Sequence, residues 1–313
     1  MNLTPGGELA LVATSLGKRY GNMWALRDCS LSIPQGRVVA LVGPNAAGKT
    51  TLLHLAVGLL APSTGEISVH GGLPAGGARA RECVGFLAQD SALYPNLSIA
   101  DTIRMAGHLN TGFDTARAKA RITQLQLPPA QKVGKLSGGQ RAQLGLSLAL
   151  AKRPRLLILD EPLSSLDPLA RHEFMAALMA AVAEDGISIV FSSHVVSELE
   201  RVADYLVLLA DGRVQVAGDV DDLLAAHRLY TGPAAQADRL AAELPVVRDR
   251  RAEAQAHLLV RVPVRTEAAH AEPPEGWQAL QVGLEELVLA YLRKPGASAF
   301  PEPRELTGRG TAA

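Results

Sequence analysis

The chain has 313 residues, of which 48% are hydrophobic, and its 31 basic residues balance 31 acidic ones. Such a length allows about two domains. A formal net charge of zero argues against a nucleic-acid partner, because such a partner would require a basic face. The two cysteines, Cys29 and Cys83, match no metal-binding spacing and are expected to be free thiols in a reducing compartment.

The sequence predicts neither a secretory signal nor a membrane span. Residues Met1–Pro5 contain no basic region followed by an apolar core. No apolar run approaches the ~18 residues that a spanning helix needs. Any role at a membrane is therefore expected to come through a partner.

The first part of the chain is predicted to consist mainly of strands joined by turns. Glycine and proline mark turns at Tyr20–Asn22 and Pro34–Gly36. The strands are expected at Leu9–Ala13, Trp24–Ile33, Val38–Val42, Glu66–His70 and Val84–Ala88. A helical block follows from Ser98 to about Leu150, with predicted helices at Ile99–His108, Asp114–Leu125 and Gln140–Ala151. This block is interpreted as a helical insertion in an α/β core.

Strands and helices then alternate again. Leu156–Leu159 is a continuous apolar run, as expected of a parallel strand that is covered on both faces. Asp211-Gly212 is a strong hairpin turn. The segments around them are predicted as a helix at Leu169–Glu184, a strand at Ile187–Ser192, a helical turn at Glu198–Ala203 and hairpin strands at Tyr205–Leu209 and Arg213–Val216.

The character of the sequence changes near residue 220, and we expect a small accessory α+β domain over 221–294. Its predicted elements are helices at Asp221–His227, Ala234–Glu243 and Leu284–Arg293, and a strand at His257–Val264. In that strand the apolar residues Leu258, Val260, Val262 and Val264 alternate with His257, Leu259, Arg261 and Pro263. Arg248–Arg251 is interpreted as a solvated turn, and residues 295–313 as a disordered tail.

A glycine-rich stretch, Gly43–Thr51, fits the pattern of a loop that wraps nucleotide phosphates. It lies between a predicted strand and a helical segment, which is the context that this motif needs. Gly43 and Gly48 let the backbone turn its N–H groups inward, and the helix N-terminus adds partial positive charge. Lys49 supplies a cation for the β- and γ-phosphates, and Thr50 supplies a hydroxyl for Mg²⁺.

Two carboxylates follow the apolar run at its C-terminal end, where open α/β sheets bind ligands. Asp160 would hold Mg²⁺, directly or through a water, and Glu161 could polarise an attacking water. Phosphoryl transfer requires little beyond positioning and charge neutralisation, so a metal, a cation and a base suffice. The alternative at this point is two ordinary acids that end a strand.

The segment Leu136–Gln140, Leu-Ser-Gly-Gly-Gln, precedes a predicted helix, and Ser137 is expected to cap it. This is a second helix start suited to an anion. It lies far from Lys49 in the sequence, across the helical block. That position makes sense if it faces a nucleotide held by another copy of the chain.

These three motifs, in this order, resemble those of ATP-binding cassette (ABC) ATPases over about residues 9–220. The resemblance implies ATP binding by Tyr20, which would stack on adenine, by Gln89, and by the loop residues Gly43, Pro44, Asn45, Ala46, Ala47, Gly48, Lys49, Thr50 and Thr51. It implies that Thr50, Gln89 and Asp160 hold Mg²⁺. It also implies that Glu161 is catalytic and that His194 is the switch histidine that contacts the γ-phosphate.

The resemblance further implies a head-to-tail dimer around two ATP molecules, which drives a separate membrane permease from the cytoplasmic face of the membrane. The residues that would contact the partner's ATP are Ser137, Gly138, Gly139, Gln140 and Asp167. The implied fold is a P-loop NTPase cassette over 1–220, with a mixed core sheet, an antiparallel β subdomain and an inserted helical subdomain at about 90–150. The small C-terminal α+β domain follows it.

The segments Ser192–Arg201 and Leu284–Leu289 look like those of the bacterial exporter branch that includes drug and antibiotic self-resistance cassettes. The sequence therefore predicts the ATPase subunit of an exporter. Two alternatives remain: a soluble, non-transport cassette and the ATPase subunit of a nutrient importer. The chain departs from the family pattern at Ala46, where these cassettes usually carry glycine. A positive φ at this position would cost about 1 kcal/mol.

Overall fold

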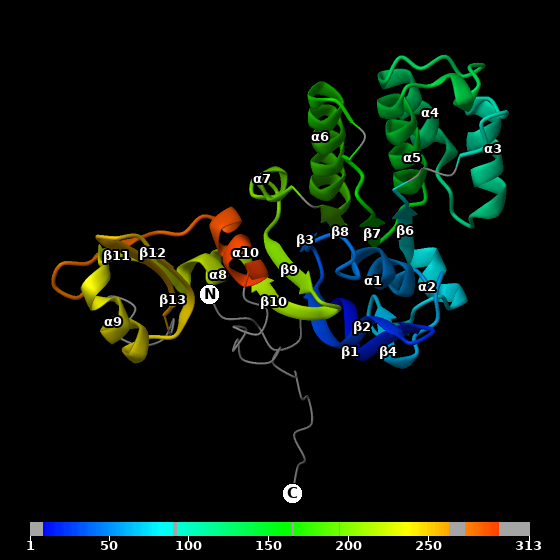
Figure 1. The fold of residues 1–313 in the computed structure, drawn as a ribbon. Coiled ribbons are helices and arrows are strands. Elements are labelled where there is room, and N and C mark those ends of the chain that lie inside the picture. The colour runs from blue at the N-terminus through cyan, green and yellow to red at the C-terminus, as the bar shows by residue number, and fades with distance from the viewer. Residues whose placement is uncertain (1–8, 90–92, 165, 194, 263–272, 294–313) are drawn as a thin grey trace, which may run out of the picture.

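The computed structural model describes residues 9–89, 93–164, 166–193, 195–262 and 273–293. They form three sheets with helices packed between and beside them (Figure 1). The predicted tail at 295–313 lies outside the described residues. No helix among these ranges combines the length and the hydropathy that a membrane crossing needs.

The central sheet has six strands in the order β10-β9-β3-β8-β7-β6. Neighbouring strands run parallel, except that β10 is antiparallel to β9. The strands are β3 (Val38–Val42), β6 (Val84–Leu87), β7 (Leu156–Leu159), β8 (Ser188–Ser193), β9 (Tyr205–Ala210) and β10 (Arg213–Asp219). The apolar runs of β3, β7 and β8 are buried on both faces, as expected of central parallel strands.

Alternate residues of these strands enter two different hydrophobic clusters, since successive side chains point to opposite faces of a sheet. Leu157 and Leu159 pack in the cluster of helices α5 (Gly138–Ala151) and α6 (Pro168–Asp185). Ile158 packs in the cluster of helix α1 (Lys49–Ala56) and the N-terminal sheet. The central sheet therefore lies between two layers.

The N-terminal sheet is antiparallel, in the order β2-β1-β4-β5. Its strands are β1 (Leu9–Tyr20), β2 (Met23–Pro34), β4 (Thr64–Val69) and β5 (Leu73–Pro74), and helix α2 (Ala78–Cys83) follows it. Strand β1 continues well beyond the predicted end at Ala13. Irregular pairing near Ser15, whose φ is 45°, breaks the alternation of the sequence there.

The predicted helical insertion contains α3 (Ile99–Leu109), α4 (Thr115–Gln124), the short 3₁₀ helix η1 (Val133–Lys135) and α5. Ser98 and Asp114 cap α3 and α4 by accepting backbone N–H groups at N3 of each helix. Ile103, Ile122 and Leu144 belong to a hydrophobic cluster of this block. Figure 1 shows α3, α4 and α5 together at one end of the molecule, away from the N-terminal sheet.

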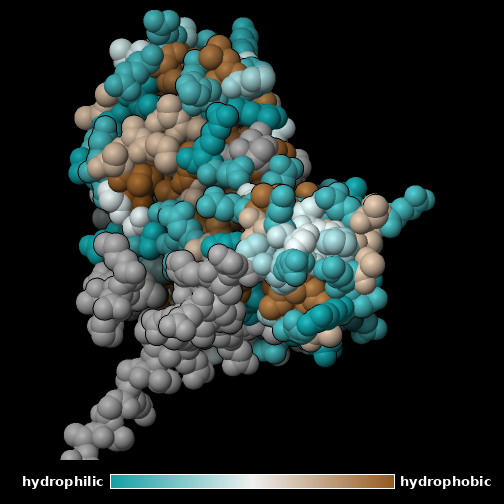
Figure 2. Space-filling view, turned by 90° about the vertical axis from the view of Figure 1, so that its left-hand side faces the viewer, coloured by the Kyte–Doolittle hydropathy of each residue, from teal (hydrophilic) through white to brown (hydrophobic). Residues whose placement is uncertain are grey.

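The C-terminal part forms a third, antiparallel sheet in the order β12-β13-β11-β14. Its elements, preceded by α7 (Val196–Leu199), are α8 (Val220–Ala225), β11 (His227–Pro233), η2 (Ala234–Gln236), α9 (Ala237–Glu243), β12 (Val246–Arg251), β13 (Gln255–Arg261), β14 (Gln278–Leu280) and α10 (Leu284–Arg293). Hydrophilic residues cover most of the molecular face in Figure 2, with smaller hydrophobic areas between them.

One expectation for this region is wrong. Arg248–Arg251 is not a turn but the end of β12, where Arg251 pairs with Asp249 and Asp238. Leu259 is fully buried, because α9 packs on one side of the sheet and α10 on the other. Leu259 shares a hydrophobic cluster with Phe191 of the central sheet. The division of the chain at residue 220 stays a prediction.

Candidate active site

Four neighbouring parallel strands end at the same edge of the central sheet. Strand β3 leads into the glycine loop, β8 ends at Ser193, β7 is followed by Asp160 and Glu161, and β6 is followed two residues later by Gln89. Leu87 pairs with Leu159, so Gln89 leaves the sheet at the level of the two acids. The strand order thus brings together motifs that are far apart in the sequence, at the edge where α/β sheets bind ligands.

The glycine loop turns into α1 with a backbone that its two glycines make possible. A Cβ at Gly43 would lie 2.3 Å from the carbonyl oxygen of Leu209. Gly48 caps α1 with a φ of 102°, and a Cβ there would lie 2.6 Å from Ala25 O. Ala46 adopts a φ of 64°, in the left-handed region that favours glycine. The departure noted in the sequence therefore falls on a strained position.

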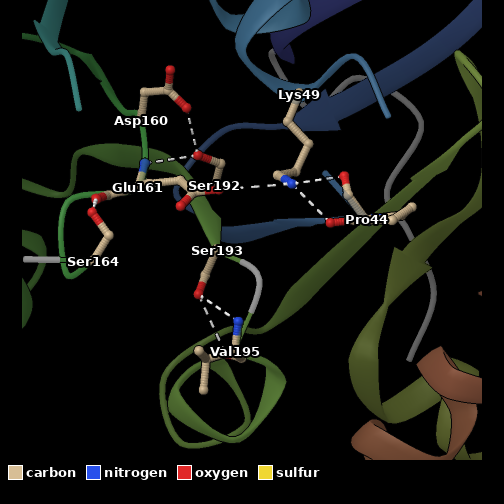
Figure 3. A network of polar contacts seen from close by, with 9 residues as sticks. Pro44, Lys49, Asp160, Glu161, Ser164, Ser192, Ser193 and Val195 are labelled. Carbon is tan, nitrogen blue, oxygen red and sulfur yellow. Dashed lines mark hydrogen bonds and ion pairs between the residues drawn. The ribbon is translucent and has the colours of Figure 1, made fainter. Parts of the chain in front are cut away.

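Lys49 is the first residue of α1, and its side chain is buried under the loop. Its Nζ donates to Gly43 O at 2.7 Å and Pro44 O at 3.1 Å, and lies 3.8 Å from Glu161 Oε1 (Figure 3). Burial lowers the pKa of Lys49, while the Glu161 and Asp160 carboxylates oppose this effect. The loop thus holds a desolvated cation for which an anionic ligand would be a favourable partner.

The two acids are joined through a residue that sequence reasoning did not assign to the site. Ser192 Oγ donates to Asp160 Oδ1 at 2.8 Å, and the backbone N–H of Glu161 donates to Ser192 Oγ at 2.8 Å. Asp160 and Ser192 are both buried, and Glu161 has a φ of 45°. The available signal was a polar residue at the end of an apolar strand run. The left-handed backbone conformation of Glu161 is strained, and conformations of this kind cluster at functional sites.

The segment Ser137–Gln140 starts α5 as predicted. Ser137 Oγ accepts from the N–H of Gln140, whose side chain accepts from the N–H of Ser137, which makes a capping box. Ser137, Gly138 and Gln140 are exposed. A Cβ at Gly139 would lie 3.0 Å from that of Ala170, in the first turn of α6. Asp167 caps that same turn through a 2.9 Å bond from Ala170 N. The residues predicted to face a second copy therefore share one exposed area.

The remaining predicted residues are described in part. Tyr20 is half exposed at the end of β1, with Lys18 Nζ 5.4 Å from its ring centre. Thr50 and Thr51 lie in the first turn of α1, and Gln89 is exposed. His194 lies outside the described residues. Within the described ranges no group of three or more His, Cys, Asp or Glu side chains could hold a metal.

The predicted Mg²⁺ ligands Thr50, Gln89 and Asp160 can each offer a side-chain oxygen, and Asp160 is the single carboxylate among them. This set fits Mg²⁺, which takes hard oxygen ligands and is usually held by one or two carboxylates together with substrate phosphates.

Comparison with known proteins places the motifs in context. The ABC transporter family model matches residues 26–164. A probable ABC transporter ATP-binding protein of Azorhizobium caulinodans is 32% identical over 72% of this chain and 84% of its own length. An Fe(3+) ions import ATP-binding protein of Pseudomonas fluorescens is 36% identical over 67% of this chain and 61% of its own. A Nod factor export ATP-binding protein of Cupriavidus pinatubonensis is 35% identical, over 66% and 65%.

The solved structures agree with the architecture. An ATP-binding subunit of an ABC transporter superposes with a TM-score of 0.62 at 28% identity, covering 68% of this chain and 91% of that one. The likeness confirms the predicted fold class, a P-loop NTPase cassette with mixed sheets and helices. The chain spans 61–63% of the length of several curated relatives.

Proposed function

Because this chain belongs to the ATP-binding cassette family of ABC transporters, we propose that it binds and hydrolyses ATP to power a separate membrane permease. One observation carries this proposal. Strands β3 and β7 bring the Lys49 ammonium to within 3.8 Å of the Glu161 carboxylate, beside the buried Asp160. A buried cation next to paired acids, under a loop shaped for phosphates, is suited to phosphoryl transfer.

ATP would bind with its phosphates in the loop between β3 and α1. The backbone N–H groups of the loop and the N-terminus of α1 attract anionic oxygens. Lys49 would exchange its bonds to Gly43 O and Pro44 O for the β- and γ-phosphates. Tyr20, half exposed, offers an aromatic face to the adenine. The proposed ATP contacts are Tyr20, Gln89 and residues 43–51.

Mg²⁺ would be held by Asp160, Thr50 and Gln89. The metal supplies charge neutralisation at the β- and γ-phosphates. Asp160 is positioned for this role by the strand that precedes it and by Ser192. Gln89 comes from the neighbouring strand β6, so the metal would connect the two sides of the site.

Hydrolysis would use Glu161 to orient and polarise the attacking water. The Lys49 ammonium lies 3.8 Å from this carboxylate. His194 is proposed as the residue that contacts the γ-phosphate. Its neighbour in the sequence, Ser193, is the last residue of β8, which ends at the same edge of the sheet as Glu161.

Two copies would form the complete sites. In each, Ser137–Gln140 and Asp167 would cover the ATP that the loop of the partner subunit holds. The exposure of Ser137, Gly138, Gln140 and Asp167 and the closeness of Gly139 to α6 support this arrangement. The dimer would work on the cytoplasmic face of the membrane through its permease.

The direction of transport is less constrained than the activity. The exporter branch predicted from the sequence is not confirmed. Relatives whose names state a cargo act in import of sulfate or thiosulfate, Fe(3+), spermidine or putrescine, and aliphatic sulfonates, and one acts in Nod factor export. Import therefore fits at least as well as export. A neighbouring gene for a binding protein would favour import, and one for a permease alone would favour export.

Phosphate release by the purified chain with ATP and Mg²⁺ tests the activity. The wild-type chain should turn over, and Glu161→Gln should bind ATP, accumulate as a dimer and lose turnover. Gel filtration with ATP and a steady-state phosphate assay measure the two effects. Turnover by Glu161→Gln at the wild-type rate would contradict the role of Glu161 as base.

A further inference from the structure

Ser192 is the link between the two acids of the site. Its hydroxyl donates its single hydrogen to Asp160 Oδ1 at 2.8 Å. The Ser192 Oγ also accepts a hydrogen bond from the backbone N–H of Glu161. The order of the chain of bonds is therefore fixed: Glu161 N–H to Ser192 Oγ, and Ser192 O–H to Asp160.

The position of Ser192 makes this link rigid. It lies on β8, which pairs with β3 on one side and β7 on the other. Its backbone is paired opposite Leu41, and its side chain is fully buried. A hydrogen bond to a carboxylate is stronger than a neutral one, and a buried setting strengthens it further.

Each bond constrains one of the acids. The bond to Oδ1 fixes the plane of the Asp160 carboxylate and so the direction of its other oxygen. The bond from Glu161 N–H holds the peptide between the two acids where Glu161 adopts its left-handed φ of 45°. In this conformation the Glu161 side chain lies beside Lys49, with Ser192 between the acids (Figure 3).

We propose that Ser192 is a positioning residue that orients Asp160 towards Mg²⁺ and Glu161 towards the attacking water. The inference rests on the proposed ATPase function and adds to it a residue that acts through both acids. Partners of metal ligands commonly change metal affinity or activity by about 10–100-fold when they are removed. Within the described ranges, the hydrogen bonds of the Ser192 hydroxyl go to Asp160 and to the N–H of Glu161 rather than to the loop at 43–51, so nucleotide binding without metal should not depend on it.

The experiment compares Ser192→Ala with Ser188→Ala. Ser188 lies on the same strand, is equally buried, and its Oγ also accepts a backbone N–H, from Gly36 at 2.9 Å, but it is at the opposite end of β8. Mn²⁺ affinity is measured by electron paramagnetic resonance with a non-hydrolysable ATP analogue, and kcat and KM by phosphate release. Metal-free nucleotide affinity is measured by fluorescence.

Ser192→Ala should weaken Mn²⁺ binding and lower kcat, each by about 10-fold or more. Its metal-free nucleotide affinity should stay near wild type, while its KM for the metal–ATP complex should rise with the loss of metal affinity. Ser188→Ala should change neither Mn²⁺ affinity nor kcat. Equal Mn²⁺ affinity and kcat in the two variants would overturn the inference. If Ser192→Ala does not fold, Ser192→Thr is compared with Ser192→Val, because threonine and valine have the same shape. The threonine variant, which keeps the hydroxyl, must retain the Mn²⁺ affinity that the valine variant loses.

Failure of the inference is separable from failure of the proposed function. A wild-type chain that neither binds nor hydrolyses ATP contradicts the function itself. A wild-type chain that turns over, with Ser192→Ala indistinguishable from it, contradicts only the role of Ser192.

Discussion

Glu200, which directly follows α7, caps the C-terminal helix α10: its Oε1 accepts the backbone N–H of Leu284 at 3.1 Å. Leu284 is the first residue of α10, so the acceptor meets a free N–H at the positive end of the helix. Leu199, next to Glu200, shares a hydrophobic cluster with Leu287 and Val288 of α10. The segment that follows β8 is thus bonded to the C-terminal helix α10.

Replacing Glu200 by alanine should lower the free energy of unfolding by about 1 kcal/mol, because it removes a helix-capping acceptor. Glu200→Gln keeps an oxygen acceptor and should lose less. Urea unfolding of the three proteins measures the difference. Equal stability of the alanine variant and wild type would show that the contact contributes nothing.

Replacing Ala46 by glycine should stabilise the chain by about 0.5–1 kcal/mol, because alanine with a φ of 64° is strained. This stabilisation is partly offset, because glycine gives the unfolded chain more conformational freedom, which folding must remove. Ala47→Gly is the matched control: this neighbour is buried and has no positive φ, so it should destabilise. Unfolding midpoints in urea measure both changes, and a destabilised Ala46→Gly would contradict the argument.

Replacing Lys49 by alanine should weaken ATP binding by about 10–100-fold, the loss expected for a charged hydrogen bond of 1.5–3 kcal/mol. Lys152→Ala is the control, since that lysine is also partly buried but donates to Val84 O at 2.9 Å instead. Titration with a fluorescent ATP analogue gives both affinities. Comparable loss in the two variants would point to a general effect on the fold.

Replacing Ser137 by arginine should lower ATPase activity by about 10-fold or more while leaving ATP binding by the monomer unchanged. The reason is that Ser137 is exposed on α5, where the proposed partner nucleotide would lie. Steady-state phosphate release is compared with nucleotide binding at a protein concentration below dimerisation. Loss of binding by the monomer would mean that the site is not shared between copies.

His227 predicts a pH dependence of stability. Its Nδ1 contacts Leu223 O at 2.7 Å and its Nε2 contacts Tyr291 Oη at 2.9 Å. Burial lowers the pKa of His227, the Arg261 charge adds to this, and the Leu223 carbonyl opposes it. Below the ordinary value of 6.5, the unfolded chain therefore binds a proton that the folded chain does not, and the free energy of unfolding falls with falling pH.

The slope from this one residue is at most about 1.4 kcal/mol per pH unit. His227→Gln should show a shallower dependence between pH 7 and pH 5. The exposed His108→Gln is the control and should keep the wild-type slope. Urea unfolding across this range measures it, and equal slopes for all three proteins would contradict the prediction.

The sequence by itself determined the local parts of the site. The phosphate loop, the Ser137 cap and the acids after β7 were predicted because each depends on neighbouring residues, through turn geometry, capping and the end of an apolar run. The strand and helix order of the cassette followed from the same short-range patterns, and the fold class is confirmed by solved relatives.

Only the tertiary structure decided the long-range parts. Ser192 reaches both acids because β8 lies between β3 and β7, an order that periodicity does not contain. Leu259 is buried because α10, at the far end of the sequence, packs on its face of the sheet. Arg251 ends a strand because its backbone pairs with Ala256 of β13. Local propensity determines elements, whereas strand order and packing determine which side chains meet.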